Sequence, residues 1–128
     1  MIKEAYCSKE VSILLKEKGF EGDISAYYHI WDNGNKVCSA QEFNHSEASH
    51  LYISAPTHQM AMRWLREVHN ILIVVSITYE KERYDWYICG IKGDPWEKEL
   101  FHEEKDVTYD TYEEAVEAAL KYALKNLI

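Results

Sequence analysis

Hydrophobic residues recur at helical spacing in three stretches of the chain, and the first of these covers residues 9–18. Ser8 stands before this stretch, where its hydroxyl can accept a hydrogen bond from an amide of the first turn. Gly19 follows it and can adopt the left-handed conformation in which many helices end. Together these signals predict a helix with one apolar face turned toward a core.

The other two helical stretches each begin on a threonine, Thr57 and Thr111, with an alanine four residues later. In the third stretch Glu114 completes a capping box with Thr111, because each side chain can accept from the other residue's amide. The predicted core face of the second helix consists of Ala61, Trp64, Leu65 and Val68. That of the third helix consists of Tyr112, Val116, Ala119, Leu120, Ala123 and Leu127.

The segment between the first two helices has the pattern of strands. Residues 26–31 are rich in aromatic side chains, and Asp32-Asn33-Gly34-Asn35 follows directly. Asn-Gly tolerates the positive φ angles of a type I′ turn, so we expect a β-hairpin that returns along residues 36–41. The polar residues 42–49 predict a loop, and residues 50–54 predict a short third strand.

A second hairpin pattern precedes the third helix. Isoleucine or valine occupies every other position from Ile71 to Ile77, and Tyr79 continues this alternation, which is typical of a strand with one buried face. Residues 84–91 are expected to form the return strand. The long acidic connection that follows is expected to contain another strand near residues 98–102.

The pattern therefore predicts an α+β fold, with three helices and antiparallel β-hairpins in the order α-β-β-(β)-α-β-β-α. We expect residues 1–128 to form a single domain, since one domain is usual for a chain of this length. Each of the last two helices follows a hairpin, so the chain contains a candidate internal ββα repeat. The sequence leaves open whether the two hairpins join one sheet.

Charge is unevenly distributed along the chain, whose net charge is −8. Ten acidic residues lie between Asp94 and Glu117, against two lysines. An acidic chain without a basic stripe binds the phosphates of nucleic acids or of anionic membranes poorly, so we expect neither as a partner. The densest part, called the acidic segment below, is a second candidate interaction surface and contains Glu97, Glu99, Glu103, Glu104 and Asp106.

The expected location is the cytoplasm. The N-terminus lacks the apolar region of a signal peptide, and the longest apolar run, residues 71–75, is far short of the ~20 residues of a membrane span. The three cysteines lie far apart and in no Cys-x-x-Cys motif. That arrangement is typical of reduced thiols rather than of a disulfide framework.

Residues with candidate chemistry are sparse. The densest group of metal-ligand types is Cys38, His45, His50 and His58, which has no recognised zinc spacing, so we expect no metal. Cys7 stands beside the first helix cap, where a thiol can be activated as a nucleophile, although burial in a core is the commoner role. No phosphate-binding glycine loop or dinucleotide fingerprint occurs, so we expect no cofactor. No catalytic residue is assigned.

Aromatic residues exceed the needs of one small core. The candidate interaction surface that they predict consists of Tyr27, Tyr28, Trp31, Tyr84, Trp86, Tyr87 and Trp96. Tyrosine and tryptophan are favoured at interfaces, so we expect a homodimer or a complex with another protein, through an aromatic hairpin face or the apolar last helix. The alternative is that these side chains cover the open face of a sheet or pack beneath the helices.

Three segments resemble small uncharacterised proteins of Bacteroides-type gut bacteria and of their phages or mobile elements. They are residues 7–20 (Cys-Ser-Lys-Glu-Val-Ser-Ile-Leu-Leu-Lys-Glu-Lys-Gly-Phe), residues 54–69 (beginning Ser-Ala-Pro-Thr-His-Gln) and residues 109–120 (beginning Tyr-Asp-Thr-Tyr-Glu-Glu). The likeness spans nearly the whole chain and implies a bacterial intracellular or phage-derived setting. That family brings no assigned activity, so no site residue is carried over from it.

These observations favour a non-enzymatic protein-binding or regulatory accessory domain of a bacterial or phage-derived element. Two alternatives stay open at this point. One is a small enzyme whose site is assembled from scattered residues. The other is an acidic DNA mimic, in which the carboxylates of the acidic segment imitate phosphates.

Overall fold

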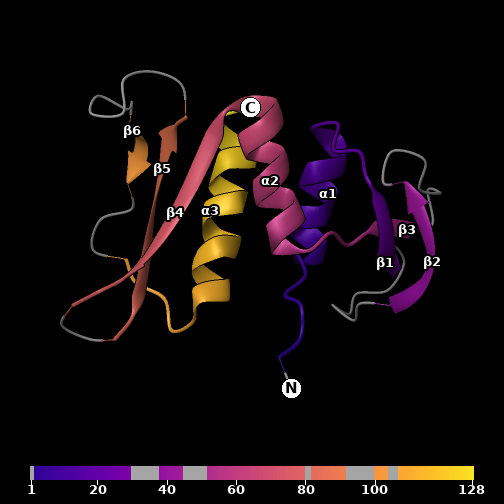
Figure 1. Cartoon of the computed structure of the whole chain (residues 1–128), viewed down its shortest axis with the longest axis horizontal. Helices are drawn as coiled ribbons and strands as arrows, with labels where there is room; N and C mark the ends of the chain where they lie inside the picture. Colours follow the sequence, from indigo (N-terminus) through magenta and orange to yellow (C-terminus); the bar gives the residue numbers. More distant parts are fainter. Residues whose placement is uncertain (1, 30–37, 45–51, 80–81, 92–99, 104–106) are drawn as a thin grey trace. The chain divides into compact units, whose positions relative to one another are not determined.

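The fold is an α+β arrangement of helices and small antiparallel sheets, as the sequence predicts (Figure 1). The computed structural model describes residues 2–29, 38–44, 52–79, 82–91, 100–103 and 107–128. Their elements, in chain order, are α1 (Lys9–Glu17), β1 (Asp23–His29), β2 (Cys38–Asn44), β3 (Tyr52–Ser54), α2 (His58–His69), β4 (Ile71–Ile77), β5 (Tyr84–Gly90), β6 (Leu100–Glu103) and α3 (Tyr112–Asn126). None of the helices in this described part of the chain has the length and hydropathy that a membrane span requires.

The chain divides into two compact units, residues 1–61 (unit 1) and residues 62–128 (unit 2). The boundary falls inside α2, after its first turn. Each unit contains one three-stranded antiparallel sheet, so the two predicted hairpins belong to separate sheets.

Unit 1 is built around β1, which pairs with β2 on one side and with β3 on the other. Helix α1 packs against β3. The predicted helix ends are confirmed, since Ser8 Oγ accepts from the Val11 amide at 3.2 Å and Gly19 has a φ of 88°. The buried hydrophobic residues described in this unit are Cys7, Val11, Leu15, Phe20, Ala26, Tyr28, Ile53, Ala55 and Ala61.

Unit 2 is a meander of β4, β5 and β6, with α3 packed against β5 and β4 (Figure 1). The β4–β5 pairing runs without a bulge from Ile71–Gly90 to Ile77–Tyr84. The strand expected near residues 98–102 is confirmed as β6. The buried hydrophobic residues described here are Met62, Leu65, Ile71, Ile73, Trp86, Ile88, Cys89, Ala115, Val116, Ala119, Leu120, Ala123 and Leu124.

Four residues predicted on buried faces are exposed instead. Val68 on α2 is 57% exposed, and Tyr112 at the start of α3 is 41% exposed. Ile77 and Tyr79 are 62% and 104% exposed, because the closed end of the β4–β5 hairpin diverges from α3 (Figure 1). Residues 42–44, expected in a loop, extend β2. The predicted turn at residues 32–35 lies outside the described residues.

The two halves of the candidate repeat share the way their helices begin but differ in the strand order of their sheets. Thr57 Oγ1 accepts from the Met60 amide at 3.2 Å, and Thr111 Oγ1 accepts from the Glu114 amide at 3.1 Å, so both helices begin with the same cap. In the part of the chain that the structure describes, three strands precede each of these helices. The first sheet, however, has the order β2-β1-β3 and the second β4-β5-β6, so the central strand is the first of one set and the second of the other.

Replacing Thr111 by alanine should lower the free energy of unfolding by about 1 kcal/mol, because the Glu114 amide at the start of α3 loses its acceptor. Thr111→Ser keeps the hydroxyl and should retain most of the stability. Urea titrations followed by circular dichroism measure both variants. Equal midpoints for the alanine variant and the wild type would show that this cap contributes nothing.

Candidate functional site

The aromatic residues of the candidate interaction surface differ in their exposure to solvent. Tyr28 and Trp86 are each only 3% exposed, so they belong to the core of their units rather than to an open surface. Tyr87 is 37% exposed, and Tyr27 and Tyr84 are half-buried. Trp31 and Trp96 lie outside the described residues, as do Glu97, Glu99, Glu104 and Asp106 of the acidic segment; Glu103 is on β6, opposite Tyr87.

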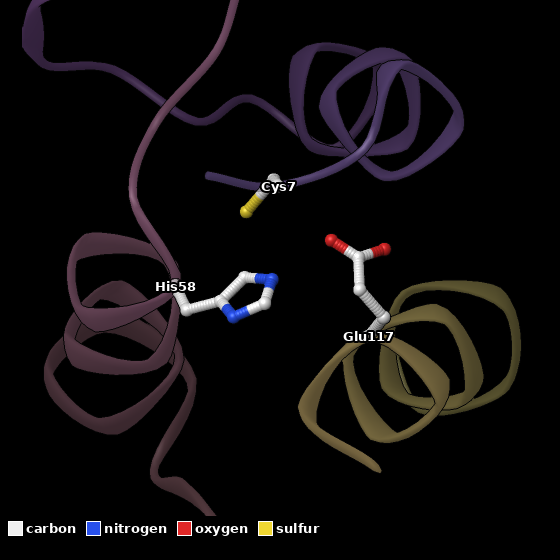
Figure 2. Close-up of side chains that lie close together, drawn as sticks. All are labelled: Cys7, His58 and Glu117. Carbon is white, nitrogen blue, oxygen red and sulfur yellow. The ribbon is translucent and has the colours of Figure 1, made fainter. Parts of the chain in front are cut away.

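Unit 1 brings together a cysteine and a histidine that are 51 positions apart in the sequence. Cys7 is fully buried and His58 is 5% exposed. A ring nitrogen of His58 lies within 4.8 Å of Cys7 Sγ, and Figure 2 shows the sulfur directed toward the imidazole. Figure 2 also labels Glu117, a residue of α3 in unit 2.

Backbone pairing holds these two residues in place. The segment before α1 and the segment before α2 run antiparallel, with a bridge between Tyr6 and Thr57. The Cys7 amide donates to the Pro56 carbonyl at 2.8 Å, and the His58 amide donates to the Ala5 carbonyl at 2.9 Å. No spacing rule in the sequence predicts this pair, because a long-range bridge creates it.

The geometry gives Cys7 a structural role. Its thiol donates to the Thr57 carbonyl across 3.8 Å, as a weak donor in a core. The Tyr28 hydroxyl donates to the Cys7 carbonyl at 2.7 Å and so ties β1 to the segment before α1. Cys7 and His58 would together offer two ligand atoms, whereas structural zinc uses four.

Unit 2 contains a hollow of about 260 Å³ between α3 and β5. We call it the aromatic groove; its lining consists of Trp86, Tyr109, Ala118, Lys121, Tyr122, Lys125 and Asn126. The residues from α3 follow the i, i+3, i+4, i+7, i+8 spacing of a single helix face. Ala118 has no side chain beyond Cβ, so the space between its larger neighbours is left open.

Aromatic contacts fix the walls of the groove. The Trp86 and Tyr122 rings lie 5.7 Å apart at 47°, and Trp86 Nε1 donates to the Tyr109 hydroxyl at 3.4 Å. Tyr109 is held in turn by two backbone hydrogen bonds with Tyr84, of 2.8 and 2.9 Å. The sequence analysis named Trp86 as a candidate interaction residue but did not predict that it lines a groove. It did not single out Tyr109 or Tyr122.

Arg83 fastens the segment that carries Tyr109. Its Nε donates to Thr108 Oγ1 at 2.5 Å, its Nη2 donates to the Thr108 carbonyl at 3.0 Å, and its Nη1 pairs with the Asp110 carboxylate. The residues before and after Tyr109 are therefore both bound to one guanidinium at the end of the β4–β5 hairpin. These contacts fix the position of the groove wall within the folded chain.

No protein-family model matches the chain, and neither a curated protein nor a solved structure matches it. The function is therefore argued from the geometry of the two units.

Tyr28→Phe should lower the free energy of unfolding by about 1 kcal/mol, because the buried Cys7 carbonyl loses the Tyr28 hydroxyl as a donor. Tyr79→Phe is the matched control, since Tyr79 is fully exposed and its hydroxyl should contribute little. Chemical denaturation with both variants makes the comparison. Equal losses in the two variants would contradict the assigned role of Tyr28.

Proposed function

We propose that this chain is a non-enzymatic protein-binding domain and that the aromatic groove of unit 2 receives one anchor side chain of its partner. The observation that supports the proposal is a preset hollow with three aromatic side chains and two lysines in its lining. Aromatic pockets that exclude water around a single inserted side chain supply much of the affinity of protein interfaces.

The size of the groove favours this class of ligand. Its volume of about 260 Å³ is below the ~300–1,000 Å³ of sites that enclose small molecules and cofactors. A single apolar or aromatic side chain needs less space than a cofactor. The rest of the partner would then lie along the surface of α3 and β5.

The chemistry of the lining indicates what accompanies the anchor. Tyr122, which is half-buried, offers a ring against which an aromatic or aliphatic side chain can pack, and the buried Trp86 ring supports it at 5.7 Å. Lys121 and Lys125 place two cationic groups on the same side, in a chain whose net charge is −8. A carboxylate next to the anchor would complement these lysines, and this complementarity would act mainly on the rate and specificity of association.

The setting that we propose is the bacterial cytoplasm, with an accessory or regulatory role in a bacterial or phage-derived element. The support for this setting is the resemblance of the chain to small proteins of gut bacteria and their phages, together with cysteines that lie in no disulfide motif. Cys7 and Cys89 are buried and have free thiols.

Selection of a random peptide display library on the wild-type chain tests the groove directly. The Ala118→Leu variant, whose larger side chain fills the hollow, serves for counter-selection. We expect the enriched peptides to share an aromatic or aliphatic residue beside Asp or Glu. The Ala118→Leu substitution should weaken the binding of a purified peptide about tenfold or more, which corresponds to ~1.4 kcal/mol of binding free energy.

Charge reversal supplies the matched control for this experiment. Lys125→Glu should weaken the binding of the same peptides. The difference in affinity between this variant and the wild type should shrink at high salt, because exposed charges are screened. Lys3→Glu reverses an exposed lysine of unit 1 and should leave binding unchanged. Peptides that bind the wild type and Ala118→Leu equally well would refute the groove as the binding site.

A further inference from the structure

Strand β4 forms one edge of the unit 2 sheet, whose order is β4-β5-β6. Among the strands that the structure describes, β5 is its one partner. A strand edge of this kind presents a row of backbone donors and acceptors to which another strand can bind.

The hydrogen bonds at the two ends of the hairpin show which backbone groups face outward. The Thr78 amide donates to the Arg83 carbonyl, and the Ile91 amide donates to the Asn70 carbonyl, so both of these pairs are hydrogen-bonded pairs. Such pairs alternate along an antiparallel ladder. The amides and carbonyls of β4 that point away from β5 therefore belong to Ile71, Ile73, Val75 and Ile77.

Three features that commonly prevent strand addition, namely a charged side chain, a proline and a bulge, are absent from this edge. Residues 71–78 include no charged residue, proline or glycine, and the register with β5 contains no bulge. Natural edge strands are commonly protected by lysine, proline or a bulge. The second half of β4 is also accessible, since Ser76 is exposed and Ile77 is 62% exposed.

We propose that a second copy of this chain pairs with the β4 edge, antiparallel and about a two-fold axis at Val74. In that register Ile73 faces Val75 of the copy, and Ile71 faces Ile77 of the copy. This register pairs all seven residues of β4 with the copy. It also lets the outward-facing amides and carbonyls of one strand form hydrogen bonds with those of the other. The contact is self-complementary, as a two-fold dimer requires.

The position of the acidic residues favours a copy at this edge over one at the opposite edge. Glu103 lies on β6, and Glu97, Glu99 and Glu104 are close to β6 in the sequence. Pairing through β4 would separate the two β6 strands by five strand spacings, about 24 Å. That distance is about three times the Debye length of ~8 Å at physiological ionic strength. The acidic β6 edges would also oppose the addition of further copies.

This dimer goes beyond the proposed groove function and does not depend on it. The groove residues lie on α3, on Tyr109 and on the α3-facing side of β5, whereas the dimer contact uses the far edge of β4. Loss of the dimer can therefore be distinguished from loss of peptide binding.

Sedimentation equilibrium up to millimolar protein tests the proposal. The wild type should approach twice the monomer mass of 15.1 kDa. Val74→Lys puts two like charges opposite one another at the axis and should weaken dimerisation about tenfold or more. The matched control is Tyr87→Lys, because Tyr87 is the cross-strand neighbour of Val74 on the same face but lies away from the edge. It should leave dimerisation unchanged.

Cross-linking tests the register itself. In a Cys38→Ser background, Val74→Cys should form a disulfide-linked dimer with oxidised glutathione, because non-hydrogen-bonded partners in antiparallel strands lie close enough for a disulfide. Tyr87→Cys should not form one. Circular dichroism must show that each variant is folded. A monomeric wild type, equal effects of the two lysine variants, or equal cross-linking of the two cysteine variants would each overturn the proposal.

Discussion

The close packing of α3 against β5 is the constraint on which unit 2 depends. Ala115, Ala119 and Ala123 are fully buried and follow one another at i, i+4 spacing on α3, which packs against β5 and β4. Small side chains allow a helix backbone to approach a sheet closely, so the large residues of β5 can fill the remaining space. Trp86 does this on the α3 side of the sheet, and its ring then forms the base of the aromatic groove.

Hydrogen bonds and an ion pair fix the segment that leads into α3 and so complement this packing. Arg83 binds the residues on both sides of Tyr109, and Thr111 caps the helix three residues after Thr108. A guanidinium suits this position because its planar donors can serve several acceptors at once. The groove wall is therefore part of the folded framework, which reduces the conformational entropy that a ligand would have to offset on binding.

The sequence predicted local features well, because their causes are local. Caps at Ser8 and Thr111 and the alternation of residues 71–77 act within a few residues, and the corresponding elements are present. Periodicity also showed which residues share a face, but it could not show where the covering element ends. Tyr112 and Ile77 were misplaced for that reason.

Features created by contacts between distant segments could not be predicted. The pairing of Cys7 with His58 depends on the bridge between Tyr6 and Thr57, which leaves no periodic signal. The aromatic groove similarly needs β5, Tyr109 and α3 together. The different strand orders of the two sheets were also out of reach, because hairpin signals specify neighbours along the chain but not the position of the third strand.

The position of the boundary inside α2 limits how this chain can be divided or recombined. Most domain junctions lie in exposed linkers, where insertion and exchange of parts are tolerated. Here a cut after Ala61 would remove the Thr57 cap and the first turn from the rest of α2, exposing amides that the helix now satisfies. A division at this boundary would therefore disrupt α2, so neither unit can be excised there with the helix intact.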